Sequence, residues 1–135
     1  PRPDSHRALG ELARVLRPGG SFMASVLNKQ RKAAQLVSEL DLDRAAEFMA
    51  TGELRLSDNG VSTYYSADEL RSCATKAGLD VLALHGTTTL SEWIPTAWLL
   101  NSDVASKLRQ LELMARRDPQ YTAYGVRFHI LAVKK

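Results

Sequence analysis

A helix pattern that leads directly into a short apolar run constrains this sequence most strongly. Residues 5–17 repeat apolar side chains every three or four positions: Leu9, Leu12, Ala13 and Leu16. This spacing predicts an amphipathic helix, which the Pro-Gly-Gly sequence at 18–20 ends. Residues 21–27 follow at once as a nearly continuous apolar run. Such a run is typical of a strand covered on both faces, so we expect a sheet with helices on each side.

The next segment reads as two short helices. Residues 30–51 are helix-prone, but the pattern breaks near Asp41, and either that residue or Asp43 can cap the second helix. Gly52 is placed to end it. Residues 57–60, Ser-Asp-Asn-Gly, predict a turn.

The remaining elements alternate between helix and strand. A capping box at Ser66-Ala67-Asp68-Glu69 predicts a helix that ends at Gly78. A strand over 79–84, which can continue through residues 87–89, and a helix over 102–117 come next. Residues 126–133 form the last predicted strand. The order of elements indicates an α/β protein.

Composition excludes several classes of protein. The 135 residues, 44% hydrophobic and 24% charged, suit one globular domain. Cys73, the only cysteine, excludes intramolecular disulfides and is predicted to be a buried small hydrophobe. His6, His85 and His129 lack metal-ligand spacing, so no structural metal is expected. Without a run of roughly 18 apolar residues or a signal-peptide pattern, we expect a soluble cytoplasmic protein with no membrane association.

The net charge of +3 gives little support for a nucleic-acid partner. Basic residues are scattered along the chain, and the one short cluster, residues 29–32, lies at the start of a predicted helix. A solvated helix face explains that cluster better than a phosphate-binding surface does. Scattered charge therefore argues against nucleic-acid binding.

Three segments together resemble class I S-adenosylmethionine-dependent methyltransferases. Residues 8–20, ALGELARVLRPGG, closely resemble the "L-x-E-hydrophobic-x-R-V-L-K/R-P-G-G" segment of that family. Residues 64–70, YYSADEL, with AGLDV at 77–81, resemble the family's entry into its next helix and strand. The ending at 128–135, FHILAVKK, resembles its closing strand. The resemblance spans nearly the whole chain and is weakest at 30–60 and 95–122.

The resemblance implies the C-terminal half of a Rossmann-like methyltransferase fold. Residues 22–27 would be the fifth strand and 79–84 the sixth, in a mixed sheet with helices on both faces. The last strand, 126–133, would lie antiparallel between them. Residues 1–135 would form one partial domain, and the helical insertion at 29–61 would form a substrate lid.

The same resemblance implies S-adenosyl-L-methionine as cofactor of the complete protein, but no cofactor-binding residue in this chain. The family's glycine-rich turn and acidic ribose ligand have no counterpart, because Gly19-Gly20 follows a helix and not a strand. An apolar strand at 22–27 without its outer neighbour would expose unpaired backbone groups. We therefore expect a missing N-terminal half or another chain to pair with it, with a homo-oligomer as one possibility.

The expected function is methyl transfer to a small-molecule acceptor, with this chain supplying the acceptor side. The alternative is a non-catalytic methyltransferase-like module for protein association. Asn28 ends the first strand and either contacts the acceptor or turns the chain. Phe48 and Met49 either line the lid or belong to its core.

Four further residues are candidates for the site, and the two tyrosines among them lie near its expected mouth. Tyr64 and Tyr65 precede the capping box, and one of them is expected to serve packing alone. His85 follows a strand and is the one candidate general base, although a structural role is favoured. Trp93 and Trp98 lie on either side of Pro95 in the sequence. They either close the pocket or take part in a contact between subunits.

Overall fold

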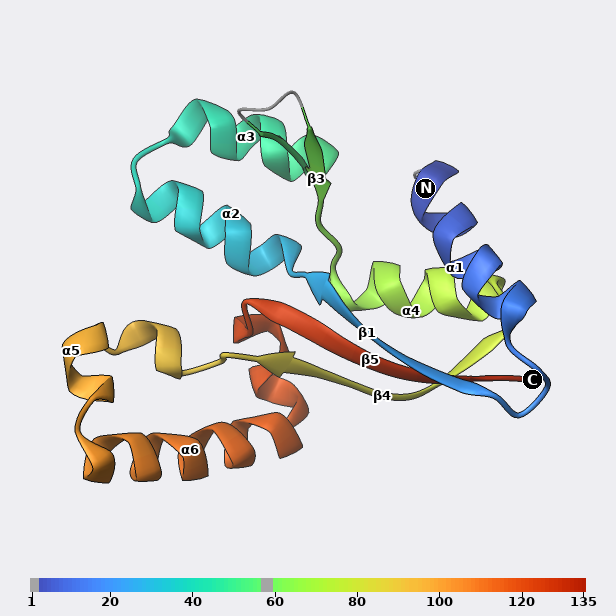
Figure 1. Ribbon diagram of the computed structural model, residues 1–135. Helices are drawn as coiled ribbons and strands as arrows, with labels where there is room; N and C mark the ends of the chain where they lie inside the picture. Colours follow the sequence, from blue (N-terminus) through green and yellow to red (C-terminus); the bar gives the residue numbers. More distant parts are fainter. Residues whose placement is uncertain (1–2, 57–59) are drawn as a thin grey trace.

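Three antiparallel strands and the helices around them make up most of the computed structural model (Figure 1). The structure describes residues 3–56 and 60–135, with side chains from residue 7 onward. In chain order the elements are α1 (Pro3–Val15), β1 (Ser21–Leu27), α2 (Lys29–Ser38), α3 (Leu42–Thr51), β2 (Glu53–Arg55), β3 (Val61–Thr63), α4 (Ala67–Lys76), β4 (Leu79–Thr87), η1 (Ser91–Trp93), α5 (Thr96–Leu99), α6 (Ser102–Arg117), η2 (Pro119–Tyr124) and β5 (Arg127–Lys134). The α/β class is confirmed.

The main sheet has the strand order β1-β5-β4. Strand β5 is antiparallel to both neighbours, with Ile130 opposite Ala24 on one side and Leu84 on the other. Strands β1 and β4 therefore run in the same direction, and the predicted antiparallel position of the last strand between them is confirmed. The described residues form only antiparallel ladders, as the expected order of these three strands requires. The mixed sheet of the complete fold stays a prediction.

One face of this sheet carries the main hydrophobic core. Residues at alternate positions of β5 are completely buried there: Phe128, Ile130 and Ala132. Helices α1 and α4 cover them with Ala13, Leu70 and Ala74. Helix α4 begins at the predicted capping box, since the Ser66 hydroxyl accepts the Glu69 N–H and the Glu69 carboxylate accepts the Ser66 N–H.

The opposite face of the sheet is only partly covered, so burial of β1 on both faces is a wrong prediction. Met23 of β1 is 68% exposed, and Leu82, where β4 bulges, is 61% exposed. Helix α6 lies on this side, below the sheet in Figure 1, and packs against β4. An apolar run indicates that a strand can be buried. It does not show whether other segments of the same chain pack against both faces of that strand.

The segment between β1 and α4 forms a second, smaller core. Helices α2 and α3 and the β2–β3 hairpin enclose Leu36, Ala45, Phe48 and Leu54. The predicted break near Asp41 is confirmed, and Gly52 ends α3 with a left-handed φ of 66°. The hairpin was not predicted, and most of the expected turn at 57–60 lies outside the described residues.

No helix in the described part of the chain is long and apolar enough to cross a membrane. The longest one there, α6, has 16 residues and buries only one side of its surface, at Leu108 and Ala115. Cys73 is 7% exposed in α4, which confirms its predicted burial.

Two glycines bring the end of β4 against the turn that leads into β5. A Cβ on Gly125 would lie 2.5 Å from the Cα of Gly86, and one on Gly86 would lie 2.6 Å from the carbonyl oxygen of Thr122. The Val126 N–H donates to the Thr87 carbonyl oxygen at 2.9 Å beside this contact. The backbones meet here because neither residue has a side chain.

We expect Gly125→Ala to destabilise the fold by about 1–3 kcal/mol, because its methyl group would collide with backbone atoms that cannot move aside freely. Gly10→Ala is the matched control, since nothing lies within 4 Å of its Cβ position in α1. It should stabilise the chain by about 0.5–1 kcal/mol. Urea unfolding measures both, and a Gly125→Ala variant as stable as the wild type would contradict this packing.

Candidate functional site

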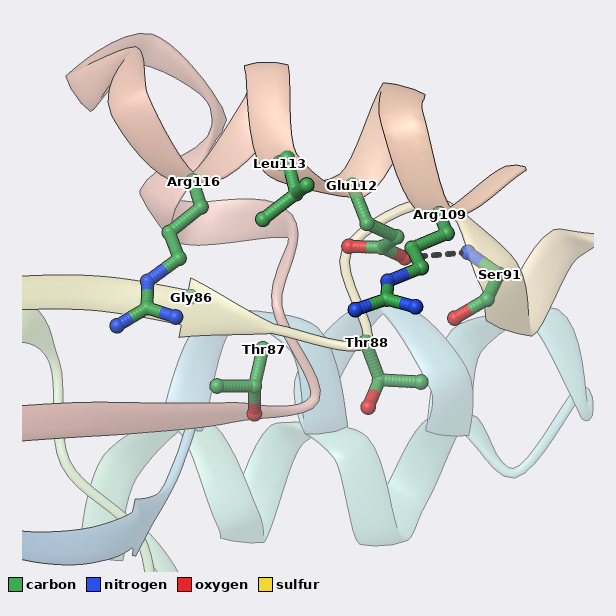
Figure 2. A pocket seen from close by; sticks show the side chains of 8 residues that line it. All are labelled: Gly86, Thr87, Thr88, Ser91, Arg109, Glu112, Leu113 and Arg116. Atoms are coloured by element: carbon green, nitrogen blue, oxygen red, sulfur yellow. Dashed lines mark hydrogen bonds between the residues drawn. The ribbon is translucent and has the colours of Figure 1, made fainter. Parts of the chain in front are cut away.

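A cleft of about 260 Å³ lies at the C-terminal end of β4, beneath one face of α6 (Figure 2). Its lining comes from two segments: Gly86, Thr87, Thr88 and Ser91 from the strand end and loop, and Arg109, Glu112, Leu113 and Arg116 from the helix. Because β1 and β4 run in the same direction, the cleft lies at the sheet edge where β1 also ends. Open α/β sheets bind ligands at the carboxyl ends of their strands.

Glu112 holds the loop that forms one wall of the cleft. Its carboxylate accepts the backbone N–H groups of Thr89 at 3.0 Å, Leu90 at 2.7 Å and Ser91 at 2.7 Å. Thr88, with a φ of 55°, adopts the left-handed conformation just before these amides. Burial by itself raises the pKa of Glu112, but the hydrogen bonds from the amides outweigh it and leave the pKa below its ordinary value. The carboxylate is therefore ionised at neutral pH.

Arg109 and Arg116 extend from α6 into the cleft on either side of Glu112 (Figure 2). Neither guanidinium forms an ion pair within the part of the chain that the structure describes. The cleft is therefore electropositive, although Glu112 is in it.

His85 lies next to the cleft but is not part of its lining. Its ring meets that of His129 edge to face, with centroids 5.7 Å apart. Burial, followed by the charges of Arg116 and His129, lowers the pKa of His85 below its ordinary value. A neutral imidazole can accept a proton, but its position beside the cleft leaves the general-base role a prediction.

Asn28 is buried, with 1% exposure, and its side-chain amide is fully engaged. The Nδ2 group donates to the carbonyl oxygens of Ala123 at 2.8 Å and Gly125 at 2.6 Å. The Oδ1 atom accepts the N–H groups of Gln30 and Arg31 and so caps α2. Asn28 was expected either to contact the acceptor or to turn the chain. The second role, at the end of β1, accounts for every hydrogen bond that its side-chain amide makes.

Phe48 and Met49 point in different directions from α3. Phe48 is 1% exposed in the second core, where its ring meets that of Tyr64 edge to face at 5.1 Å. Met49 is 59% exposed. Neither residue lines the cleft.

The two tyrosines connect the helical insertion to the main sheet. Burial raises the pKa of Tyr64, with a partial offset from the charges of Arg127 and Arg44, so its phenol stays protonated at neutral pH. The Tyr65 N–H donates to the Leu27 carbonyl oxygen at 2.9 Å, and its own carbonyl oxygen accepts the Lys29 N–H. Tyr65 also packs against the main core.

Trp93 contacts the insertion from the loop that follows β4. The Arg31 guanidinium of α2 lies 4.7 Å from the centre of the Trp93 ring and forms an ion pair with Glu92 at 2.9 Å. Trp93 remains 64% exposed, and Trp98 in α5 is 59% exposed. The structure thus places Trp93 near the cleft, at a junction between two segments.

The sequence predictions missed the polar residues that line the cleft. Arg109, Glu112 and Arg116 share one face of α6, and a charged stripe of this kind is usually a solvated surface. Their partners at 86–91 come about twenty residues earlier in the chain. The helical spacing of the three charges was a visible signal, but only the folded chain shows what they face.

The Gly19-Gly20 turn does not fit the cofactor grip of a methyltransferase. The Gly19 N–H donates to the Lys134 carbonyl oxygen at 3.0 Å, and the Gly20 N–H donates to that of Arg17 at 2.8 Å. These amides are thus already used, and they lie at the N-terminal end of β1, away from the cleft. Among the described residues there is also no group of three or more His, Cys, Asp or Glu side chains that could hold a metal ion.

Comparisons of the chain with protein-family models and with curated proteins found no match.

Replacing Glu112 by glutamine should destabilise the chain by about 2 kcal/mol at pH 7, because hydrogen bonds to a charged group are lost. The folded-state pKa is lowered, so this stabilisation is complete above the ordinary pKa of 4.5 and disappears as the pH falls through the folded-state value. The difference between wild type and Glu112→Gln, measured by urea unfolding, should therefore shrink between pH 7 and pH 3.

Glu47→Gln is the control, because Glu47 is exposed on α3. Equal unfolding midpoints for the two variants at pH 7 would show that the Glu112 contacts contribute nothing to stability. A stability difference between wild type and Glu112→Gln that stays constant down to pH 3 would contradict the negative charge assigned to Glu112.

Proposed function

We propose that this chain forms the acceptor side of an S-adenosylmethionine-dependent methyltransferase that acts on a small molecule. One observation carries the proposal. The Pro-Gly-Gly turn leads from α1 into β1, and the final strand β5 lies antiparallel between β1 and β4. This is the arrangement that the sequence resemblance implies for the last three strands of the family's sheet.

The cleft supports the proposal by its place and size. It lies at the carboxyl end of β4, and its volume of about 260 Å³ suits a small organic molecule. The sulfonium of the cofactor, when bound, already activates the methyl group. The work left to this chain is therefore to align the acceptor and exclude water.

The proposed substrate lid consists of residues 29–61. Its first helix, α2, begins at the end of β1 and is tied to the loop after β4 through the contacts of Arg31 with Glu92 and Trp93. The Arg31 contacts thus couple the position of the insertion to the loop that forms one wall of the cleft.

A second candidate function is a non-catalytic module for protein association. Large apolar side chains are exposed on the sheet at Met23 and Leu82, and after β4 at Trp93 in η1 and Trp98 in α5. Such surfaces mark sites where other polypeptides bind. In the methyltransferase proposal the N-terminal half of the same protein, or another chain, covers the sheet face and pairs with β1.

Calorimetric titration with S-adenosylhomocysteine distinguishes these functions. The 135-residue chain alone should not bind it, whereas a longer protein that includes the preceding segment should. Binding by the chain alone would show that the cofactor site lies within it. A longer protein that binds a protein partner but no S-adenosylhomocysteine would establish the association module in place of the enzyme.

A further inference from the structure

We propose that Arg109 and Arg116 bind the anionic group, a carboxylate or a phosphate, of a small organic molecule in the cleft between β4 and α6. The proposal rests on the proposed function only in identifying that molecule as the methyl acceptor. The binding site itself is argued from the charges, contacts and shape of the cleft.

The position of Glu112 leaves both guanidinium groups available. On a helix surface, a glutamate three residues after one arginine and four before another would normally pair with both. Here the Glu112 carboxylate accepts three N–H groups from residues 89–91 instead. Within the described residues, neither Arg109 nor Arg116 has a carboxylate at ion-pairing distance. The Glu112 oxygens that could bind the two guanidinium groups are thus engaged by backbone amides, and the single carboxylate charge offsets only part of the two positive charges.

Both arginines also face the same space. They lie two helical turns apart, about 10 Å along the axis of α6, and long side chains can span much of that interval. Figure 2 shows their guanidinium groups extending from the helix toward the strand end and the loop. The Thr87 hydroxyl there donates to the Arg127 carbonyl oxygen at 3.4 Å. An anion in the cleft would therefore meet both cations on the side formed by α6.

The cleft suits an anionic group attached to an apolar body. The planar guanidinium presents paired N–H donors that match the oxygens of a carboxylate or a phosphate. Leu113 supplies an apolar wall, and Gly86 contributes a surface without a side chain. At about 260 Å³ the cleft has room for a ring or a short chain beside the anionic group.

Nuclear magnetic resonance titrations with benzoate, phenyl phosphate and benzamide test this inference on the whole chain. Benzoate or phenyl phosphate should shift the amide signals of residues 86–91 and 109–116. Benzamide matches benzoate in shape but has no charge, so it should bind at least about tenfold more weakly. The stronger of the two anions identifies the group as carboxylate or phosphate.

Variants of α6 assign the binding to particular residues. Arg109→Gln and Arg116→Gln should each weaken the binding of the preferred anion about tenfold, whereas Arg109→Lys should retain part of it. Arg117→Gln is the matched control, because Arg117 is exposed on the same helix but does not line the cleft. The amide spectrum of each variant shows whether it remains folded.

Three results would overturn the inference: no binding of either anion, equal binding of benzamide, or equal weakening by Arg117→Gln and Arg116→Gln. The titrations need no cofactor, so they can refute anion binding without refuting the proposed function. Anion binding by a protein that transfers no methyl group would overturn the function alone. Methyl transfer to an acceptor without an anionic group, unaffected by Arg116→Gln, would overturn the identification of the bound anion as the methyl acceptor.

Discussion

The insertion of β5 between β1 and β4 is the constraint on which the rest of the structure depends. This strand supplies hydrogen-bond partners to both neighbours along their length, and its Phe128, Ile130 and Ala132 form the centre of the main core. The close contact of Gly86 with Gly125 and the hydrogen bonds from Asn28 fix the turn that leads into it. The strand ends thereby meet at one edge of the sheet. The cleft and the start of the helical insertion both lie at that edge.

The same arrangement leaves one part of the sheet without neighbours. Within the described residues β5 is the only strand that pairs with β1. On the outer edge of β1 the Leu27 carbonyl oxygen accepts the Tyr65 N–H at its C-terminal end, and no strand pairs with the rest of that edge. Exposed Met23 and Leu82 lie on a sheet face that α6 covers only near β4. Edges and faces of this kind favour pairing with further polypeptide.

Local patterns in the sequence predicted the elements well and their environment poorly. The spacing of apolar residues, the capping box at Ser66 and the glycine at 52 depend on neighbouring residues, and the structure confirms them. The position of β5 followed from the resemblance alone, because strand order depends on contacts between distant segments. The β2–β3 hairpin was too short to leave a clear periodic signal.

The cleft was beyond prediction for the same reason. Asparagine before a helix is a recognisable cap, but its hydrogen bonds to Ala123 and Gly125, almost a hundred residues later, leave no local trace. Likewise, the charges on α6 resemble any solvated stripe until Glu112 is seen to face the loop. The prediction that β1 is buried on both faces was wrong. The sequence of a strand shows that its side chains are apolar, but it does not show whether other segments of the same chain pack against both of its faces.

Hydrogen–deuterium exchange of the β1 amides tests most directly whether the sheet is completed by polypeptide outside the described residues. In the monomeric 135-residue chain, amides that point toward β5 should be protected and those on the outer edge should exchange rapidly. In a longer protein that includes the preceding segment, both sets should be protected. Protection of the outer amides in the monomeric chain alone, or their rapid exchange in the longer protein, would contradict the account.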